Sequence, residues 1–178
     1  MKIKDKSFKV FIREEEIRDR VSKISEDINQ KYSDTEIYVI GILTGAYCFA
    51  ADLSRDLCIP FEIKFVQIQS YIGMQSGGDV LIGNIDHLNI KDRHVLIVDD
   101  VLETGETLYQ FIELISKSKP CSIALATLFL KTDQVRHDIH PEFVGFEIGP
   151  EFIVGYGMDY NGAGRGLRDV YIHDHDAI

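Results

Sequence analysis

Acidic and hydroxyl side chains gather at one point of the sequence, directly after an apolar run. Residues 95–98 read Val-Leu-Ile-Val, and behind them come two aspartates and the segment Glu-Thr-Gly-Glu-Thr at 103–107. Gly105 lets the backbone approach a ligand closely, and Thr104 and Thr107 add hydroxyl donors. A helix that begins here presents free N–H groups and the positive end of its dipole. The segment therefore predicts a cradle for one phosphate group.

The same segment carries an excess of negative charge. Asp99, Asp100, Glu103 and Glu106 all lie within a few residues of the predicted cradle. Because like charges this close repel each other, a cation is expected beside them. One interpretation is a hard divalent metal that bridges the carboxylates and a polyanion. The other is a sugar-ring carbocation that the carboxylates stabilise during a reaction, and the two are compatible.

The elements that must position this segment alternate between strands and helices. The spacing of Ile17, Val21, Ile24 and Ile28 predicts an amphipathic helix between residues 13 and 32. Further apolar patterns predict strands at 37–43, 61–69, 94–98 and 122–130, helices at 46–57 and around 108–115, and a mobile glycine-rich loop at 71–78. This order predicts an α/β fold with a mostly parallel sheet, which binds ligands at the carboxyl ends of its strands.

Composition narrows the class of protein. The chain has 178 residues, 45% hydrophobic and 27% charged, which is typical of a globular domain. The formal net charge of −10 argues against nucleic acid or a membrane surface as a partner and favours small molecules. No apolar run is long enough to cross a bilayer, and the first residues do not resemble a secretory signal, so a cytoplasmic location is expected.

Cysteine and histidine residues give no metal motif. Cys48, Cys58 and Cys121 are far apart and lie in apolar runs, so we expect reduced residues within the core. His173 and His175 have a spacing that suits a metal in an extended chain, but a solvated tail is the preferred interpretation.

The apolar strand, the acidic pair and the Thr-Gly-x-Thr loop resemble the phosphoribosyl pyrophosphate (PRPP) binding motif of the type I phosphoribosyltransferases. Four further segments are similar to the hypoxanthine-guanine members of that family: residues 42–53, Ser70-Tyr71, residues 143–148, and residues 152–161 with Arg165. The similarity runs from about residue 10 to residue 170. It implies the type I phosphoribosyltransferase fold, with a mostly parallel central sheet flanked by helices and a small hood built from the chain ends.

The resemblance also implies an organisation of the chain and roles for its residues. It implies one domain over 1–178, with a flexible loop at about 70–80, a PRPP loop at 99–107 and a base-binding hood from about 150 onward. The implied catalytic residues are Glu103 as acid/base and the ribose-binding pair Asp99 and Asp100. The implied PRPP contacts are Thr104, Gly105, Glu106, Thr107, Thr44, Gly45, Arg165, Ser70 and Tyr71.

The implied base site lies in the last third of the chain. Lys131 would hydrogen-bond the purine O6, Phe152 would stack on the ring, and Ile153 would offer its backbone to the base edge. Asp159 completes the implied purine set, and with Asp99 and Asp100 it would hold Mg²⁺, the implied cofactor. The implied partners are PRPP and a purine base, and the implied assembly is a homodimer or homotetramer.

Three residues depart from the family pattern. The family usually has aspartate where this chain has Glu103, and often lysine where Thr44 stands. Misplacement of a reacting group by about 1 Å costs roughly a hundredfold in rate, so the extra methylene of Glu103 matters. Glu106 adds a negative charge beside the phosphate cradle, and we expect its side chain to point to solvent.

The resemblance implies purine salvage, in which a 5-phosphoribosyl group passes from PRPP to hypoxanthine or guanine to give IMP or GMP and pyrophosphate. Two alternatives stay open. The departures at Thr44 and Glu103 would permit a PRPP- or nucleotide-binding regulator with weak or no turnover. A phosphoribosyltransferase for another base, such as xanthine or a pyrimidine, would share the phosphate half of the site.

Overall fold

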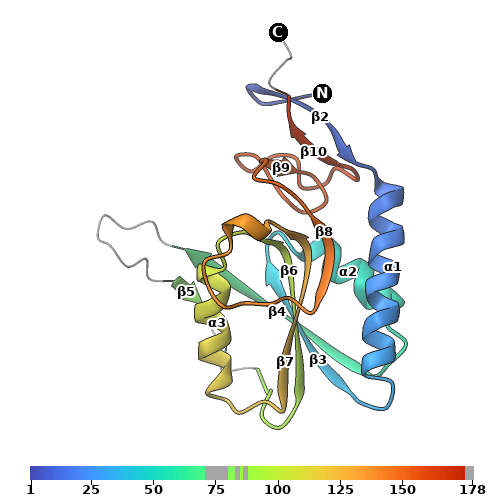
Figure 1. Ribbon diagram of the computed structural model, residues 1–178, viewed down its shortest axis with the longest axis vertical. Coiled ribbons are helices and arrows are strands. Elements are labelled where there is room, and N and C mark those ends of the chain that lie inside the picture. Colours follow the sequence, from blue (N-terminus) through green and yellow to red (C-terminus); the bar gives the residue numbers. More distant parts are fainter. Residues whose placement is uncertain (71–79, 83–84, 86–87, 175–178) are drawn as a thin grey trace.

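The computed structural model describes residues 1–70, 80–82, 85 and 88–174 of the protein, and these residues form two β-sheets (Figure 1). The glycine-rich loop predicted at 71–78 lies outside the described residues. Of the helices in the described part, none combines the length and apolarity needed to cross a bilayer.

The larger sheet runs in the order β5-β4-β3-β6-β7-β8 across the described part of the chain. Its strands are β3 (Ile37–Leu43), β4 (Phe61–Ser70), β5 (Val80–Ile82), β6 (His94–Leu102), β7 (Ser122–Leu130) and β8 (Phe143–Glu147). Neighbouring strands are parallel except for β5, which pairs antiparallel with β4. The predicted α/β class with a mostly parallel sheet is confirmed.

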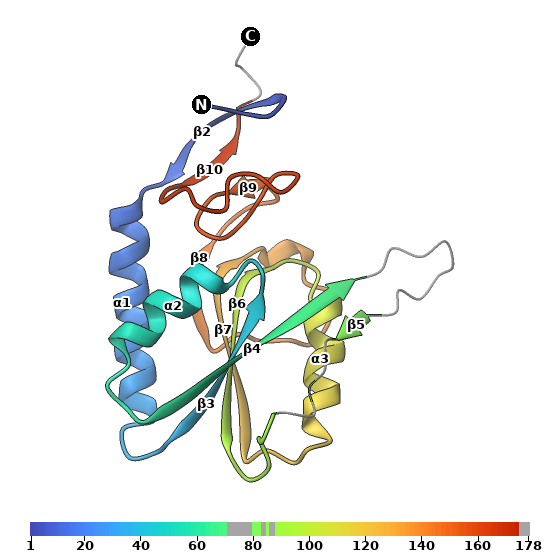
Figure 2. The same ribbon diagram turned by 180° about the vertical axis from the view of Figure 1, so that it is seen from behind.

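Helices cover both faces of this sheet. Helices α1 (Glu14–Lys31) and α2 (Tyr47–Asp56) lie on one face, and α3 (Glu106–Ser116) lies on the other (Figure 2). Because side chains alternate along a strand, Val39 packs with the α1 and α2 residues, whereas Tyr38 and Ile40 pack with α3. The predicted stripe of isoleucine and valine on α1 is fully buried in this way.

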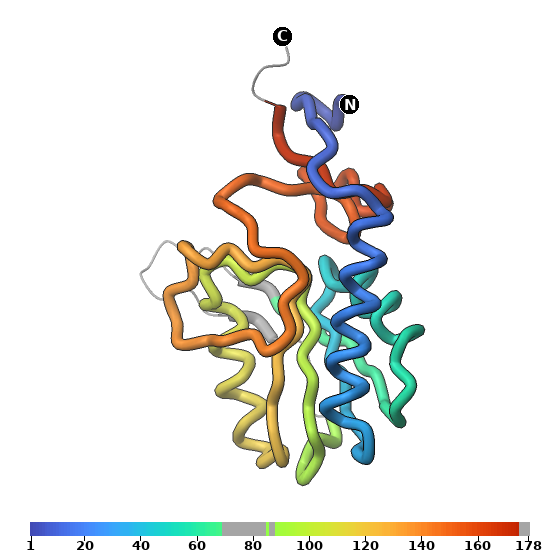
Figure 3. The backbone as a smooth tube through the Cα atoms, turned by 45° about the vertical axis from the view of Figure 1, so that its right-hand side comes forward, coloured from blue at the N-terminus to red at the C-terminus, as the bar shows by residue number. Residues whose placement is uncertain are grey.

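A smaller antiparallel sheet stands beyond the carboxyl edge of the large one, as the tube in Figure 3 shows. Its strands are β1 (Lys2–Ile3), β2 (Lys6–Ile12), β10 (Val170–His173) and β9 (Ile153–Val154), paired in that order. Phe8, Ile3 and Val154 form its own small apolar cluster. Both ends of the described chain thus contribute to this sheet, which we call the hood. The family resemblance implied such a hood, built from the chain ends.

Several local predictions differ from the structure. Strand β6 continues through the acidic pair to Leu102 instead of ending at Val98, because Asp99 and Val101 still pair with β7. Cys58 and Cys121 are free thiols as predicted, but both are exposed and Cys48 is half-buried. The apolar runs around Cys58 and Cys121 belong to buried elements, while these two residues stand in the turns between them.

His173 does not lie in a solvated tail. It belongs to β10 and meets the ring of Phe8 edge-on, with 5.9 Å between ring centroids. The antiparallel pairing of β10 with β2 extends to His173, which lies opposite Phe8. His175 lies outside the described residues.

Candidate active site

The predicted phosphate cradle forms the turn between β6 and α3. Gly105 has φ +78°, a left-handed conformation that suits glycine, and a Cβ there would stand 3.1 Å from Ile139. The hydroxyl of Thr104 accepts a hydrogen bond from the Glu106 N–H at 3.4 Å. A pocket of about 150 Å³ opens here, lined by Asp99 and residues 101–108. The predicted cradle residues Thr104, Gly105 and Thr107 are all among these lining residues, so they meet at one pocket.

The acidic pair lies near the carboxyl end of β6, and Asp99 lines this pocket. Both side chains are half-buried, and the backbone N–H of Asp100 donates to Asp99 Oδ1 at 3.1 Å. Burial, together with the neighbouring charge of Asp100, raises the pKa of Asp99 well above its usual range. Burial also raises the pKa of Asp100. Ionising both carboxyls therefore costs free energy, which a bound cation would offset.

The turn after β3 packs against this pair. Gly45 lies so close to Asp100 that a Cβ on it would stand 1.9 Å from Asp100 Oδ2. On its other side, a Cβ on Gly157 would stand 2.1 Å from the Gly45 carbonyl oxygen. The peptide bond between Leu43 and Thr44 is cis. Glycine at 45 and 157 therefore lets two distant backbone segments meet and lets the Asp100 carboxylate pack directly on the Gly45 backbone.

Asp159 and Arg165, predicted to bind metal and pyrophosphate, lie together in the segment between β9 and β10. Arg165 Nη2 stands 2.5 Å from Asp159 Oδ1, and the Gly162 N–H donates to Asp159 Oδ2 at 2.6 Å. Arg165 Nη1 donates to the carbonyl of Gly157 at 2.7 Å. Both side chains are therefore held in place, and each keeps hydrogen-bonding capacity for a ligand, since a guanidinium has five N–H donors and a carboxylate about four acceptor sites.

The residues predicted for base chemistry lie at the ends of adjacent strands. Lys131 follows β7 and is 6% exposed, and its Nζ stands 3.3 Å from Glu103 Oε1, which follows β6. A buried ammonium needs such a partner. Phe152 is 50% exposed and meets Tyr160 edge-on, whereas Ile153 is buried in β9. The structure thus pairs Lys131 with Glu103 and leaves the Phe152 ring accessible.

The remaining predicted contacts are less closely defined. Thr44 lies in the turn after β3, and Ser70 is the last residue of β4. Tyr71 lies outside the described residues. Glu106 lines the phosphate pocket, but its exposed carboxylate is held by neighbours on α3 and beyond it, as expected for a side chain that points to solvent.

The donor set is compatible with magnesium. Within the described ranges, no three metal-binding side chains stand together. Mg²⁺ is commonly held by one or two carboxylates, several waters and substrate phosphates, so a dedicated cage of protein ligands is not required. Because a bound cation would offset the cost of ionising Asp99 and Asp100, this pair fits Mg²⁺ held together with substrate phosphates and water.

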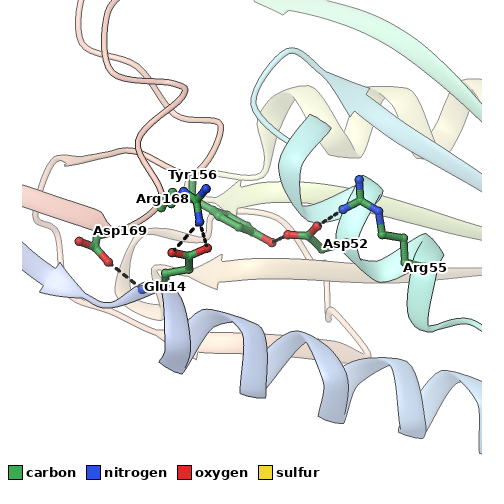
Figure 4. Close-up of polar contacts among 6 residues, drawn as sticks. All are labelled: Glu14, Asp52, Arg55, Tyr156, Arg168 and Asp169. Atoms are coloured by element: carbon green, nitrogen blue, oxygen red, sulfur yellow. Dashed lines mark hydrogen bonds and ion pairs between the residues drawn. The ribbon is translucent and has the colours of Figure 1, made fainter.

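Sequence reasoning missed the contacts that hold the hood in place. Tyr156 is buried, and its hydroxyl donates a hydrogen bond to Asp52 Oδ2 on α2 at 2.7 Å (Figure 4). Asp52 also forms an ion pair with Arg55 on the same helix. Burial and this hydrogen bond raise the pKa of Tyr156. These residues lie 104 positions apart, and no local pattern in the sequence announces the pair.

A second set of contacts joins the hood to the start of α1. Arg168 Nη1 stands 3.0 Å from Glu14 Oε1, and the Glu14 N–H donates to Asp169 Oδ1 at 2.8 Å (Figure 4). The hood is thus fixed to both helices on one face of the large sheet.

Two half-buried aspartates and the predicted phosphate-binding turn meet at the carboxyl edge of a parallel sheet, an arrangement that indicates a phosphoribosyltransferase. The family model described as the phosphoribosyl transferase domain matches residues 13–161.

Individual relatives narrow the class. A hypoxanthine-guanine phosphoribosyltransferase of Aquifex aeolicus is 36% identical, covering 96% of this chain and 97% of the relative. A hypoxanthine phosphoribosyltransferase of Salmonella typhimurium is 38% identical over 85% of this chain and 86% of the relative. A crystal structure of a hypoxanthine-guanine phosphoribosyltransferase from Bacillus anthracis superimposes with a TM-score of 0.88 at 29% identity, covering 94% and 99% of the two chains. The chain therefore belongs to the hypoxanthine-guanine phosphoribosyltransferase family.

Proposed function

We propose that the protein acts in purine salvage and transfers the 5-phosphoribosyl group of PRPP to N9 of hypoxanthine or guanine. The bond between C1′ and N9 forms, and the bond between C1′ and the pyrophosphate oxygen breaks, with its electron pair leaving on pyrophosphate. The purine loses one proton. The products are IMP or GMP and pyrophosphate. The observation that carries the proposal is the Lys131–Glu103 pair at 3.3 Å, at strand ends beside the phosphate pocket.

The phosphate half of the proposal rests on the cradle. Thr104, Gly105 and Thr107, with the backbone N–H groups of the turn, hold the 5′-phosphate at the start of α3. Asp99 and Asp100 hold the ribose hydroxyls and favour the positive charge that develops on the sugar ring. Thr44, Gly45, Arg165, Ser70 and Tyr71 are proposed for the pyrophosphate, where a guanidinium makes paired hydrogen bonds.

The base half rests on residues at the strand ends and below the hood. Lys131 donates to the purine O6, Phe152 stacks on the ring, and Ile153 offers its backbone. Glu103 exchanges the proton at N7, and its contact with Lys131 places the two groups to serve one carbonyl and one ring nitrogen.

Mg²⁺ is part of this proposal. Asp99, Asp100 and Asp159 are its proposed ligands; because these three do not stand together in the described structure, one or two of them would hold it with substrate phosphates and water. When bound, it neutralises the pyrophosphate as a leaving group. The ion pair between Asp159 and Arg165 keeps the two groups together, so a metal held by Asp159 and the Arg165 guanidinium could contact the same pyrophosphate.

A panel of bases tests the proposal directly. Pyrophosphate release from PRPP and Mg²⁺ is measured with hypoxanthine, guanine, xanthine, adenine, uracil or no base. Release that requires hypoxanthine or guanine is the expected result. Release only with xanthine or uracil would assign another base, and silence with PRPP still bound would leave the regulator suggested by Thr44 and Glu103.

Assembly is proposed as a homodimer or homotetramer. The described surface exposes large apolar side chains, including Phe65 at 40% and Val10 at 42%, which suit a contact between copies. Light scattering of the purified chain measures the assembly, and a monomer at working concentration would contradict it.

A further inference from the structure

Glu106 poses an electrostatic problem for the proposed phosphate site. It is the first residue of α3 and lines the phosphate pocket. A carboxylate at this position is attracted by the same helix dipole and N–H groups that bind a phosphate. A freely rotating Glu106 therefore competes with the phosphate and repels it.

Both carboxylate oxygens of Glu106 are held by donors outside the pocket. Gln110 Nε2 donates to Oε1 at 2.8 Å, and His137 Nε2 lies 2.7 Å from Oε2. These two hydrogen bonds, Gln110 first, lower the pKa of Glu106. Because Gln110 is on the same helix, His137 is the partner that comes from another segment of the chain.

The segment that carries His137 packs directly on the cradle. It follows the short helix η1 (Thr132–Gln134) and passes beside α3 (Figure 1). The Arg136 N–H donates to the Thr104 carbonyl at 3.0 Å. The ring of His137 stacks on Tyr109 with 4.7 Å between centroids and 18° between planes. The imidazole is thus fixed in the position from which it reaches Glu106.

We propose that His137 is a positioning residue for binding of the 5′-phosphate: it holds the Glu106 carboxylate away from the cradle and so lets an acidic residue stand at the start of α3. This inference rests on the proposed function only in naming the ligand as a phosphoribosyl compound. The Nε2–H of His137 makes the hydrogen bond, while its ring makes the stacking contact with Tyr109.

The substitution His137→Phe separates these two roles, because phenylalanine keeps the ring and lacks the N–H group. Ribose 5-phosphate probes the cradle together with the ribose-binding pair Asp99 and Asp100, and pyrophosphate, which lacks the ribosyl phosphate, serves as the comparison ligand. We expect the variant to weaken ribose 5-phosphate binding, and to raise the KM for PRPP, by about three- to fivefold. Pyrophosphate affinity and kcat are expected to stay within about twofold of the wild type.

Rescue decides whether Glu106 is the cause. In the double variant Glu106→Gln with His137→Phe, no carboxylate is left to repel the phosphate, and we expect ribose 5-phosphate affinity to return to the wild-type value. His140→Phe is the matched control, since His140 makes a similar 2.7 Å contact with Asp138 on the same segment but both side chains are highly exposed. This control is expected to bind like the wild type.

Two results would overturn the inference. One is unchanged ribose 5-phosphate affinity in His137→Phe. The other is a double variant as weak as the single one, which would assign the effect to packing of the segment. Thermal unfolding of each variant reports whether the fold is intact. A wild type that binds ribose 5-phosphate but turns over no base would overturn the proposed function and leave this test unaffected.

Discussion

The carboxyl edge of the large sheet and the hood both supply residues to the candidate site, but the chain assembles them differently. The phosphate cradle comes from one continuous stretch, residues 99–108, between a buried strand and the helix that follows it. The hood joins strands from both ends of the described chain and is held by polar contacts such as Tyr156 to Asp52. The cradle is thus a local structure, whereas the hood depends on long-range contacts.

The two regions meet at Gly45, and Gly45→Ala should have the largest effect. The new Cβ would overlap the Asp100 carboxylate, which has to move or displace the turn after β3. We expect kcat/KM to fall about a hundredfold or more, with a loss of roughly 1–3 kcal/mol in the free energy of unfolding. Steady-state kinetics and urea unfolding measure both.

Gly166→Ala is the control for this substitution. A Cβ at Gly166 meets no atom within 4 Å in the described structure, so activity and stability should stay near wild type. If Gly45→Ala also kept activity and stability near wild type, close packing at Gly45 would not couple the cradle to the hood.

Glu103 tests whether the strand ends carry the base chemistry. Glu103→Gln keeps the size of the side chain and removes the base, so kcat should fall about a hundredfold, with ribose 5-phosphate affinity unchanged. Glu103→Asp should also alter kcat by shortening the reach. Equal turnover in Glu103→Gln would remove this carboxylate from the mechanism.

The substitution Tyr156→Phe should loosen the hood while leaving the cradle intact. Loss of the hydrogen bond to the Asp52 carboxylate should cost about 1–2 kcal/mol of stability and raise the KM for the purine a few-fold. Ribose 5-phosphate affinity should not change. Calorimetric binding of each ligand distinguishes the two regions.

Tyr109→Phe is the matched control, because its exposed hydroxyl also bonds a carboxylate, Glu113, but on α3. Its stability should stay within about 0.5 kcal/mol of the wild type. If Tyr156→Phe weakened ribose 5-phosphate as much as purine, the cradle and the hood would have to be treated as one unit.

The smallest expected effect is on stability: Asp99→Asn should stabilise the fold slightly. The same substitution should reduce activity. Because burial raises the pKa of Asp99 in the folded protein, its ionisation favours the unfolded chain as pH rises above the ordinary aspartate range. At neutral pH the variant should be more stable than the wild type. Urea unfolding at pH 4 and pH 7 measures this difference, which should shrink at the lower pH. A variant less stable at pH 7 would contradict it.

The contrast between a local cradle and a hood built from long-range contacts explains how far the sequence predicts each region. The bounds of β7 were predicted in full, and so was the meeting of Thr104, Gly105 and Thr107 at one pocket, because periodicity and turn chemistry act over a few neighbouring residues. The family resemblance supplied the hood and the Lys131–Glu103 neighbourhood. Hydrophobic periodicity predicted neither the hood nor this neighbourhood.

The contacts that were missed are set by tertiary packing. The pairing of Asp159 with Arg165, and of Tyr156 with Asp52, depends on how turns with positive φ fold back on themselves. The wrong placement of Cys58 and Cys121 in the core has a related cause. Each stands next to apolar residues in the sequence, but the chain turns there before the next strand enters the sheet.

The pairing of β2 with β10 has a consequence for how the protein is made. Strand β2 leaves the ribosome early, but its partner Val170–His173 is among the last of the described residues to be synthesised. The parallel sheet and the cradle lie between them in sequence, so they have their strands available first. A growing chain therefore passes through a stage with a phosphate cradle and an unpaired β2 edge, and such edges attract other chains. Late translation of β10 closes that edge and completes the hood.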